Sequence, residues 1–197
     1  MALLLLPATF GARAAESVLK RELPLPERSW SLIERIGIAT RIDPGIPNYY
    51  PRSGVHGSLD IGAVRNLTAS TSLGGNLYLG IDDRRSRFGI KVRCTQWLAR
   101  DLAFDLAPGI LLAGGDSWDG SAQYPGFVGD ATLSLYGWVH VTAQVESVNL
   151  THPTLPGRRD TSWYIGAQGT GPRGALLLAG GGLAFLAVRG FLFLVAG

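Results

Sequence analysis

The chain has 197 residues, 46% of them hydrophobic, which is enough for one domain with a core of its own plus an appendage. Its net charge of +3 comes from scattered arginines with acids between them, without a basic stripe, which argues against nucleic-acid binding. The single cysteine, Cys94, excludes an internal disulfide and any multi-cysteine metal site, while 27 glycines and five tryptophans are typical of a β-rich protein near lipid or inside an assembly.

The N-terminus combines a short apolar run, residues 2–6, with a small-residue site at 12–14. A secretory signal peptide needs a basic first region and an apolar stretch of about 7–15 residues. Here no basic residue precedes the run, and Pro7 ends it. We therefore expect a retained arm rather than a cleaved export signal.

Residues 1–54 are expected to form an extended arm, because prolines interrupt them too often for a long helix or a central strand. The prolines between residues 16 and 53 are Pro24, Pro26, Pro44, Pro47 and Pro51. One or two helical turns are expected at 31–36, with Ser29 or Ser31 as the cap. The arm is rich in apolar and aromatic groups, so it lies along a partner or over its own sheet. Its candidate contact residues are Trp30, Ile33, Tyr49 and Tyr50.

Residues 55–167 alternate between apolar and polar side chains, which is the period of β-strands. Val139, Val141 and Ala143, for example, alternate with His140 and Thr142. The predicted strands centre on 58–63, 76–81, 88–95, 102–106, 130–135, 139–146 and 162–166. Tight turns between them predict a mainly β domain, an antiparallel meander of six or seven strands. Its apolar face has to be buried by closing or folding over.

The alternation resembles the strands of outer-membrane β-barrels, which are about ten residues long with apolar side chains outside and polar ones inside. The turn at 82–85 and the aromatic residues Trp97, Tyr136 and Trp138 near strand ends add to the resemblance. It implies an independent barrel in an outer membrane. The missing export signal opposes this, as does an apolar C-terminal segment that would lodge in an inner membrane first. We therefore expect the apolar face to be a protein core, in a small soluble barrel or sandwich.

The longer loops, 113–126 and 149–160, are expected to be docking edges. In the first, Gly115-Asp116-Ser117 resembles the nucleophile block of GDSL-type hydrolases, where a serine works with a histidine base and an acid. That family has an α/β fold with the block near its start, whereas here the block sits in a β-loop. An ordinary Asp–Ser turn is the competing interpretation, and a loop-borne hydrolase is a third hypothesis for function.

The three histidines, His56, His140 and His152, lie in separate segments without metal-ligand spacing, so the sequence predicts no metal and no cofactor. His140 falls on the polar face of its strand and is expected at the surface. Cys94 alternates with predicted core positions and is expected to be a small buried apolar group.

The last 24 residues, 174–197, are predicted to form a transmembrane helix of roughly 36 Å, against a hydrocarbon core of about 30 Å. Arg189 costs roughly 2.5–3.5 kcal/mol near the bilayer centre, while the apolar residues return on the order of 5 kcal/mol. Arg189 is expected to face a protein neighbour or to snorkel to the headgroups. Gly180, Ala184 and Ala187 form a small-residue stripe on which a partner helix packs.

These features predict a non-enzymatic, membrane-anchored accessory subunit that docks onto a larger membrane complex, for instance a photosynthetic reaction centre–antenna or a respiratory complex. Its expected partners are other subunits and the lipid bilayer. It is expected to be a single-pass protein of the inner membrane, and basic residues before the anchor favour a cytoplasmic β domain. The independent outer-membrane barrel is the alternative.

Overall fold

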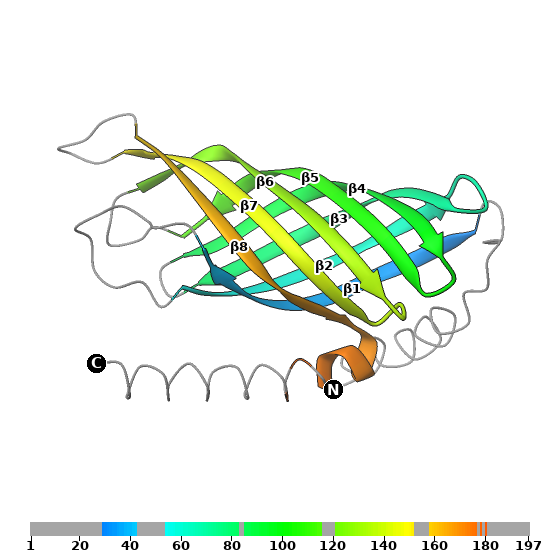
Figure 1. The fold of residues 1–197 in the computed structure, drawn as a ribbon. Coiled ribbons are helices and arrows are strands. Elements are labelled where there is room, and N and C mark those ends of the chain that lie inside the picture. Colours follow the sequence, from blue (N-terminus) through cyan, green and yellow to red (C-terminus); the bar gives the residue numbers. More distant parts are fainter. Residues whose placement is uncertain are drawn as a thin grey trace, which may run out of the picture.

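A computed structural model describes residues 29–42, 54–82, 85–115, 121–151 and 158–176, together with residues 178 and 180. Eight antiparallel strands form one closed barrel, and Figure 1 shows them wrapped around a single axis. The strands are β1 (Trp30–Arg41), β2 (Val55–Asn66), β3 (Thr71–Asp82), β4 (Ser86–Ala99), β5 (Leu102–Gly114), β6 (Ser121–Leu135), β7 (Val139–Thr151) and β8 (Arg158–Thr170). The predicted antiparallel meander is confirmed, with eight strands in a barrel rather than six or seven.

Each strand pairs with the next along the chain, and β8 closes the barrel on β1. Following paired residues once around the barrel from Trp30 leads back to β1 at Thr40, a shift of ten residues. The path runs through Trp30, Arg65, Leu73, Cys94, Leu106, Ala131, Ala143, Ile165 and Thr40. A shift of this size means that the strands are strongly tilted against the barrel axis, as closure of eight strands requires.

Strand β1 lies in the segment that the sequence analysis assigned to an extended arm. Residues 31–36, where helical turns were expected, are paired with β2, and residues 35–41 are also paired with β8. The prolines allow this because they flank the strand, with Pro26 before it and Pro44 after it. The inward side chains of β1, such as Ile33 and Ala39, are buried, while Leu32 and Ile36 are exposed.

The barrel has two unlike ends. At the turn end, on the right in Figure 1, the connections 67–70, 100–101 and 136–138 are short, and β1 begins and β8 ends there. At the loop end, the connections are 42–54, 83–85, 115–120 and 152–157. After β8, Gly171 adopts a φ of 66° and starts a helical turn, 171–176. This turn packs tightly, since a Cβ on Gly169 would lie 2.4 Å from Gly174.

The predicted C-terminal helix falls mostly outside the described residues, which end at 180. Arg189, Ala184 and Ala187 are among the residues not described, and Gly180 is exposed. Within the described ranges, no helix is long and apolar enough to cross a membrane.

Candidate functional site

The outer surface of the barrel carries a belt of apolar side chains. These residues, here called the outer belt, are 38–58% exposed, and every strand contributes to them. They are Leu32, Ile36, Ile61, Leu73, Leu77, Ile81, Phe88, Ile90, Val92, Phe104, Leu106, Ile110, Leu112, Phe127, Leu133, Val141, Trp163 and Ile165. The prediction that the apolar face would form a protein core is wrong, because this face points outward.

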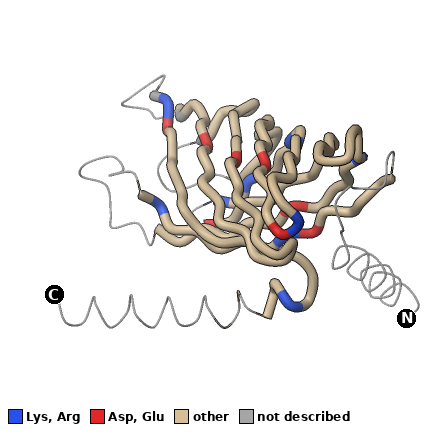
Figure 2. The backbone as a smooth tube through the Cα atoms, turned by 45° about the vertical axis from the view of Figure 1, so that its right-hand side comes forward, with Lys and Arg blue, Asp and Glu red and all other residues tan. Residues whose placement is uncertain are grey.

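Charged side chains behave in the opposite way. Figure 2 shows that acidic and basic residues lie along the strands themselves. Most of these side chains are buried inside the barrel. Six cations and six acids have side chains at most 13% exposed. They are Arg35, Arg41, Arg85, Arg87, Lys91, Arg93, Asp60, Asp82, Asp105, Asp130, Glu146 and Asp160. Among described residues, the exposed charged ones lie at or near the ends of the barrel: Glu34, Arg65, Arg100, Asp101, Arg159 and Arg173.

Lys91 occupies the centre of this lumen network. Its Nζ lies 2.6 Å from Asp60 Oδ1 and 2.5 Å from Asp130 Oδ2, and all three side chains are at most 1% exposed. The same ammonium sits 4.1 Å from the centre of the Tyr78 ring. Arg93 adds a longer contact of 3.5 Å to Asp60. Buried charges are tolerated when they are paired in this way, so the lumen is held together by mutually neutralising groups.

Towards the loop end, Arg87 joins two acids. Its guanidinium lies 2.6 Å from Glu146 and 2.7 Å from Asp82. Glu146 also accepts a 2.5 Å hydrogen bond from the Tyr78 hydroxyl, and His56 Nε2 lies 2.9 Å from the same hydroxyl. These contacts link four strands across the lumen and leave it filled by side chains at this level.

Towards the turn end, Asp105 is the central acceptor. It pairs with Arg35 at 2.9 Å and accepts hydrogen bonds from the hydroxyls of Thr95 and Ser134. Because Ser134 gives its hydrogen to Asp105, His140 Nδ1 donates to the Ser134 oxygen, 2.8 Å away, and Nε2 accepts from Thr170 at 2.7 Å. A nucleophilic serine would instead give its proton to the histidine. This serine–histidine pair therefore belongs to a chain of structural hydrogen bonds.

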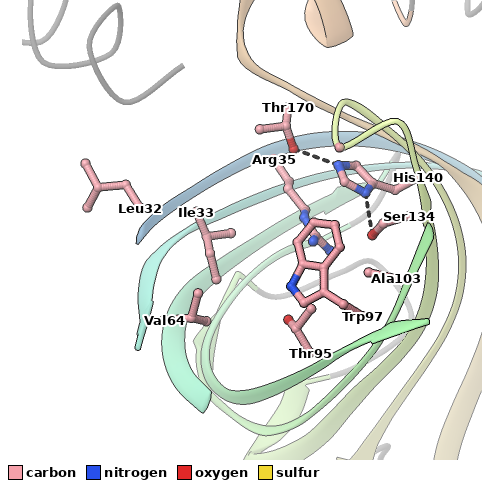
Figure 3. A pocket seen from close by; sticks show the side chains of 11 residues that line it. Leu32, Ile33, Arg35, Val64, Thr95, Trp97, Ala103, Ser134, His140 and Thr170 are labelled. Atoms are coloured by element: carbon pink, nitrogen blue, oxygen red, sulfur yellow. Dashed lines mark hydrogen bonds between the residues drawn. The ribbon is translucent and has the colours of Figure 1, made fainter. Parts of the chain in front are cut away.

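A cavity of about 50 Å³ lies beside this chain at the turn end. Figure 3 shows Arg35, Ser134, His140 and Thr170 around it, with Trp97 facing them. It belongs to the lumen, since β2, β4, β5, β6 and β7 also line it, and we call it the seam cavity because β1 and β8 form one of its sides. Among the described residues, no group of three His, Cys, Asp or Glu side chains is placed to hold a metal ion.

The residues singled out in the sequence lie in different parts of the structure. Trp30 is 68% exposed at the turn end, and Ile33 is buried in the lumen. Tyr49, Tyr50 and Ser117 lie outside the described residues, as Arg189 does.

Three single-residue expectations are corrected. Cys94 is exposed on the outer face instead of buried, and His140 is buried in the lumen instead of at the surface. Trp97 is buried inside the barrel, whereas Tyr136, which is 66% exposed, stands on the outside as an aromatic at a strand end should. All three corrections have the same cause: the apolar face of the sheet lies outside the barrel and the polar face lies inside.

Comparison with known proteins returned one structural similarity. The chain is similar to the outer membrane protein Ail of Yersinia pestis, whose backbone structure was determined in a phospholipid bilayer nanodisc. The identity is 11%, the match covers 69% of this chain and 97% of that one, and the TM-score is 0.37. No family model and no curated protein matches the chain. The description of the fold therefore rests on the geometry of the barrel itself.

The resemblance in strand pattern to outer-membrane β-barrels is confirmed by the closed eight-stranded barrel. The prediction of an accessory subunit of a photosynthetic or respiratory complex is corrected by the same finding. That prediction required a water-soluble β domain with an apolar anchor, whereas this barrel carries its apolar surface on its own outside. The predicted single-pass location in an inner membrane is corrected for the same reason.

Proposed function

We propose that this chain is an integral β-barrel protein of an outer membrane, and that its barrel serves as an anchor rather than as an open pore or an enzyme. The observation that carries the proposal is the reversed polarity: apolar side chains outside on all eight strands and paired charges inside. Water-soluble proteins rarely expose apolar patches larger than a few hundred Å². A belt that encircles the molecule is suited to hydrocarbon.

Closure of the sheet supports the same proposal. In a bilayer every backbone N–H and C=O has to be satisfied within the protein, and only helices and closed barrels achieve this. Here each strand has a neighbour on both sides, except at residues 30–34 of β1 at the turn end, and strands of 12–15 residues exceed the 9–11 or so needed to span a bilayer at a tilt.

The filled lumen supports an anchor over a pore. Lys91, Asp60 and Asp130 contact one another across the centre, and Arg87 and Glu146 do so nearer the loop end. With charges this close, the centre of the barrel holds side chains instead of a column of water.

The connection lengths support an orientation. Outer-membrane barrels have short turns on the periplasmic side and longer loops outside. We therefore place the turn end in the periplasm and the loop end, with its longer connections 42–54, 115–120 and 152–157, outside.

The test is to express the full chain with an export leader in a Gram-negative host and to fractionate the membranes. The proposal expects the protein in the outer-membrane fraction, with a faster band on unheated gels that shifts on boiling. Recovery in the soluble fraction, or extraction with inner-membrane proteins and no mobility shift, would overturn it.

A further inference from the structure

The wall of the barrel is incomplete beside the seam cavity. Strand β1 pairs with β2 from Trp30 onward, but its pairing with β8 begins only at Arg35, opposite Thr170. Residues 30–34 therefore have a strand neighbour on one side only, and Figure 1 shows β1 running on past the end of β8. Leu32 and Ile33 of this segment line the cavity, as does Thr170 at the end of β8. The cavity thus borders on the gap in the wall.

The polar side of the cavity offers one unused group. The hydroxyl hydrogens of Thr95 and Ser134 are directed at Asp105, and Thr170 bonds His140. Arg35 uses Nη2 for Asp105, while its Nη1 has no hydrogen-bond partner among the described residues, although the side chain is only 10% exposed. An arginine side chain can only donate hydrogen bonds. The unpaired Nη1 of Arg35 therefore favours a ligand that accepts hydrogen bonds, and a negatively charged ligand most strongly.

Local charge favours an anion as well. Arg35 pairs with Asp105 at 2.9 Å. Arg93 is fully buried and reaches Asp60 only at 3.5 Å. One buried water needs about 10–15 Å³ of such space, so a cavity of about 50 Å³ admits a carboxylate or phosphate group but no larger head.

The outer side of the gap is apolar at Trp30 and Leu32 and carries one exposed acid, Glu34. Leu32 is 53% exposed and Trp30 is 68% exposed, on the part of β1 that has no β8 neighbour. Aromatic side chains at the end of a membrane barrel lie at the level of the lipid headgroups. A lipid head at that level is next to the gap, and its tail is next to Leu32.

We propose that the seam cavity binds the oxyanion head of a membrane amphiphile, a fatty-acid carboxylate or a lipid phosphate, on Arg35 Nη1, with the tail outside the barrel along Leu32. This inference rests on the proposed function, because the tail needs a bilayer around the barrel. Asp105 opposes the binding, since it is a carboxylate that competes for the same guanidinium.

The experiment uses the full chain in nanodiscs of zwitterionic lipid and follows the backbone amide signals of Gly137 and Thr170, both at the cavity. The probes are dodecanoate and dodecyl phosphate, with dodecyltrimethylammonium as the tail with the wrong charge. Acetate and inorganic phosphate are the same heads without a tail. We expect saturable shifts with the first two and at least about tenfold weaker binding of the other three.

Two variants separate binding from stability. Arg35→Leu combined with Asp105→Asn removes one charge of each sign, so the lumen stays neutral, and binding of dodecanoate should fall about tenfold or more. Asp105→Asn alone should bind dodecanoate several-fold more tightly, because the competing carboxylate is gone. A purely structural role for Arg35 does not predict this gain.

Equal shifts with dodecyltrimethylammonium, equal affinity for acetate, or unchanged binding in the double variant would each overturn the inference. Heat-dependent gel mobility of the same samples keeps the two proposals apart. A barrel that is inserted but does not bind removes only the amphiphile site, while a chain without the folded band removes the membrane barrel itself.

Discussion

Lys91 gives the sharpest test of the lumen. Replacing it with methionine keeps most of the side-chain volume but removes the cation that lies 2.6 Å from Asp60 and 2.5 Å from Asp130. Asp60 retains a 2.6 Å hydrogen bond from Asn76 and the charge of Arg93. Asp130 keeps no ion pair or hydrogen bond of this kind with the described residues, since Lys91 is its contact and its Oδ1 has no hydrogen-bond partner among them. The variant thus leaves one buried carboxylate uncompensated.

Removing one partner of a buried ion pair costs about 3–5 kcal/mol. We expect Lys91→Met to lower the free energy of unfolding by this amount, and Lys91→Met with Asp130→Asn to recover most of it, because the second change removes the orphaned charge. The adjacent outward residue, Val92, is the matched control: Val92→Ala should cost less than about 1 kcal/mol.

The assay is urea unfolding in phospholipid vesicles, followed by the fraction of the fast, unheated band on gels. The reasoning about the lumen is refuted if Lys91→Met unfolds within about 0.5 kcal/mol of the wild type. It is also refuted if adding Asp130→Asn destabilises the variant further, because the charge of Asp130 would then not be the cause of the loss.

Three further predictions use the same unfolding assay. Leu77→Arg, in the outer belt, should lower the free energy of unfolding in vesicles by about 2–4 kcal/mol. Leu67→Arg, equally exposed but in a turn, should lower it by less than about 1 kcal/mol. Equal losses would contradict a belt set in hydrocarbon. Gly62→Ala should cost about 1–3 kcal/mol, since its Cβ would lie 2.1 Å from a carbonyl oxygen, while Gly57→Ala, with 3.7 Å of space, should be neutral; a neutral Gly62→Ala would show that the strands separate easily there. Tyr78→Phe should cost about 1–3 kcal/mol, because Glu146 loses a buried hydrogen-bond donor, and an unchanged midpoint would mean that Arg87 and Gln144 satisfy this acid without it.

The sequence was sufficient to locate most strands but not to decide which face of the sheet lies inside. Alternation of period two places Val92 and Cys94 opposite Lys91 and Arg93, and this pattern is identical for a soluble barrel and a membrane barrel. The deciding signal was the charge on the polar face. Among the described residues, six acids and six bases lie on that face, as a sealed lumen needs, whereas a solvated face has no such requirement.

Strand β1 was missed for a different reason. Prolines on both sides suggested an irregular arm, and Glu34 interrupts the outward apolar series between Leu32 and Ile36. Its place in the barrel depends on pairing with β8, more than 120 residues later, which no local pattern reveals. The seam cavity could not be predicted either, because seven strands that are far apart in the sequence line it.

The most direct test of the central claim uses the one native cysteine. Cys94 is exposed on the outer face of β4, paired with Leu73 and Leu106, so a bilayer should cover it. In nanodiscs, a charged water-soluble maleimide should leave Cys94 unlabelled, whereas a lipid-soluble maleimide should label it. The control, Ala69→Cys with Cys94→Ser, places the thiol in an exposed turn and should react with both reagents. Rapid reaction of Cys94 with the water-soluble reagent, at the rate of the control, would contradict a barrel whose apolar face is in lipid.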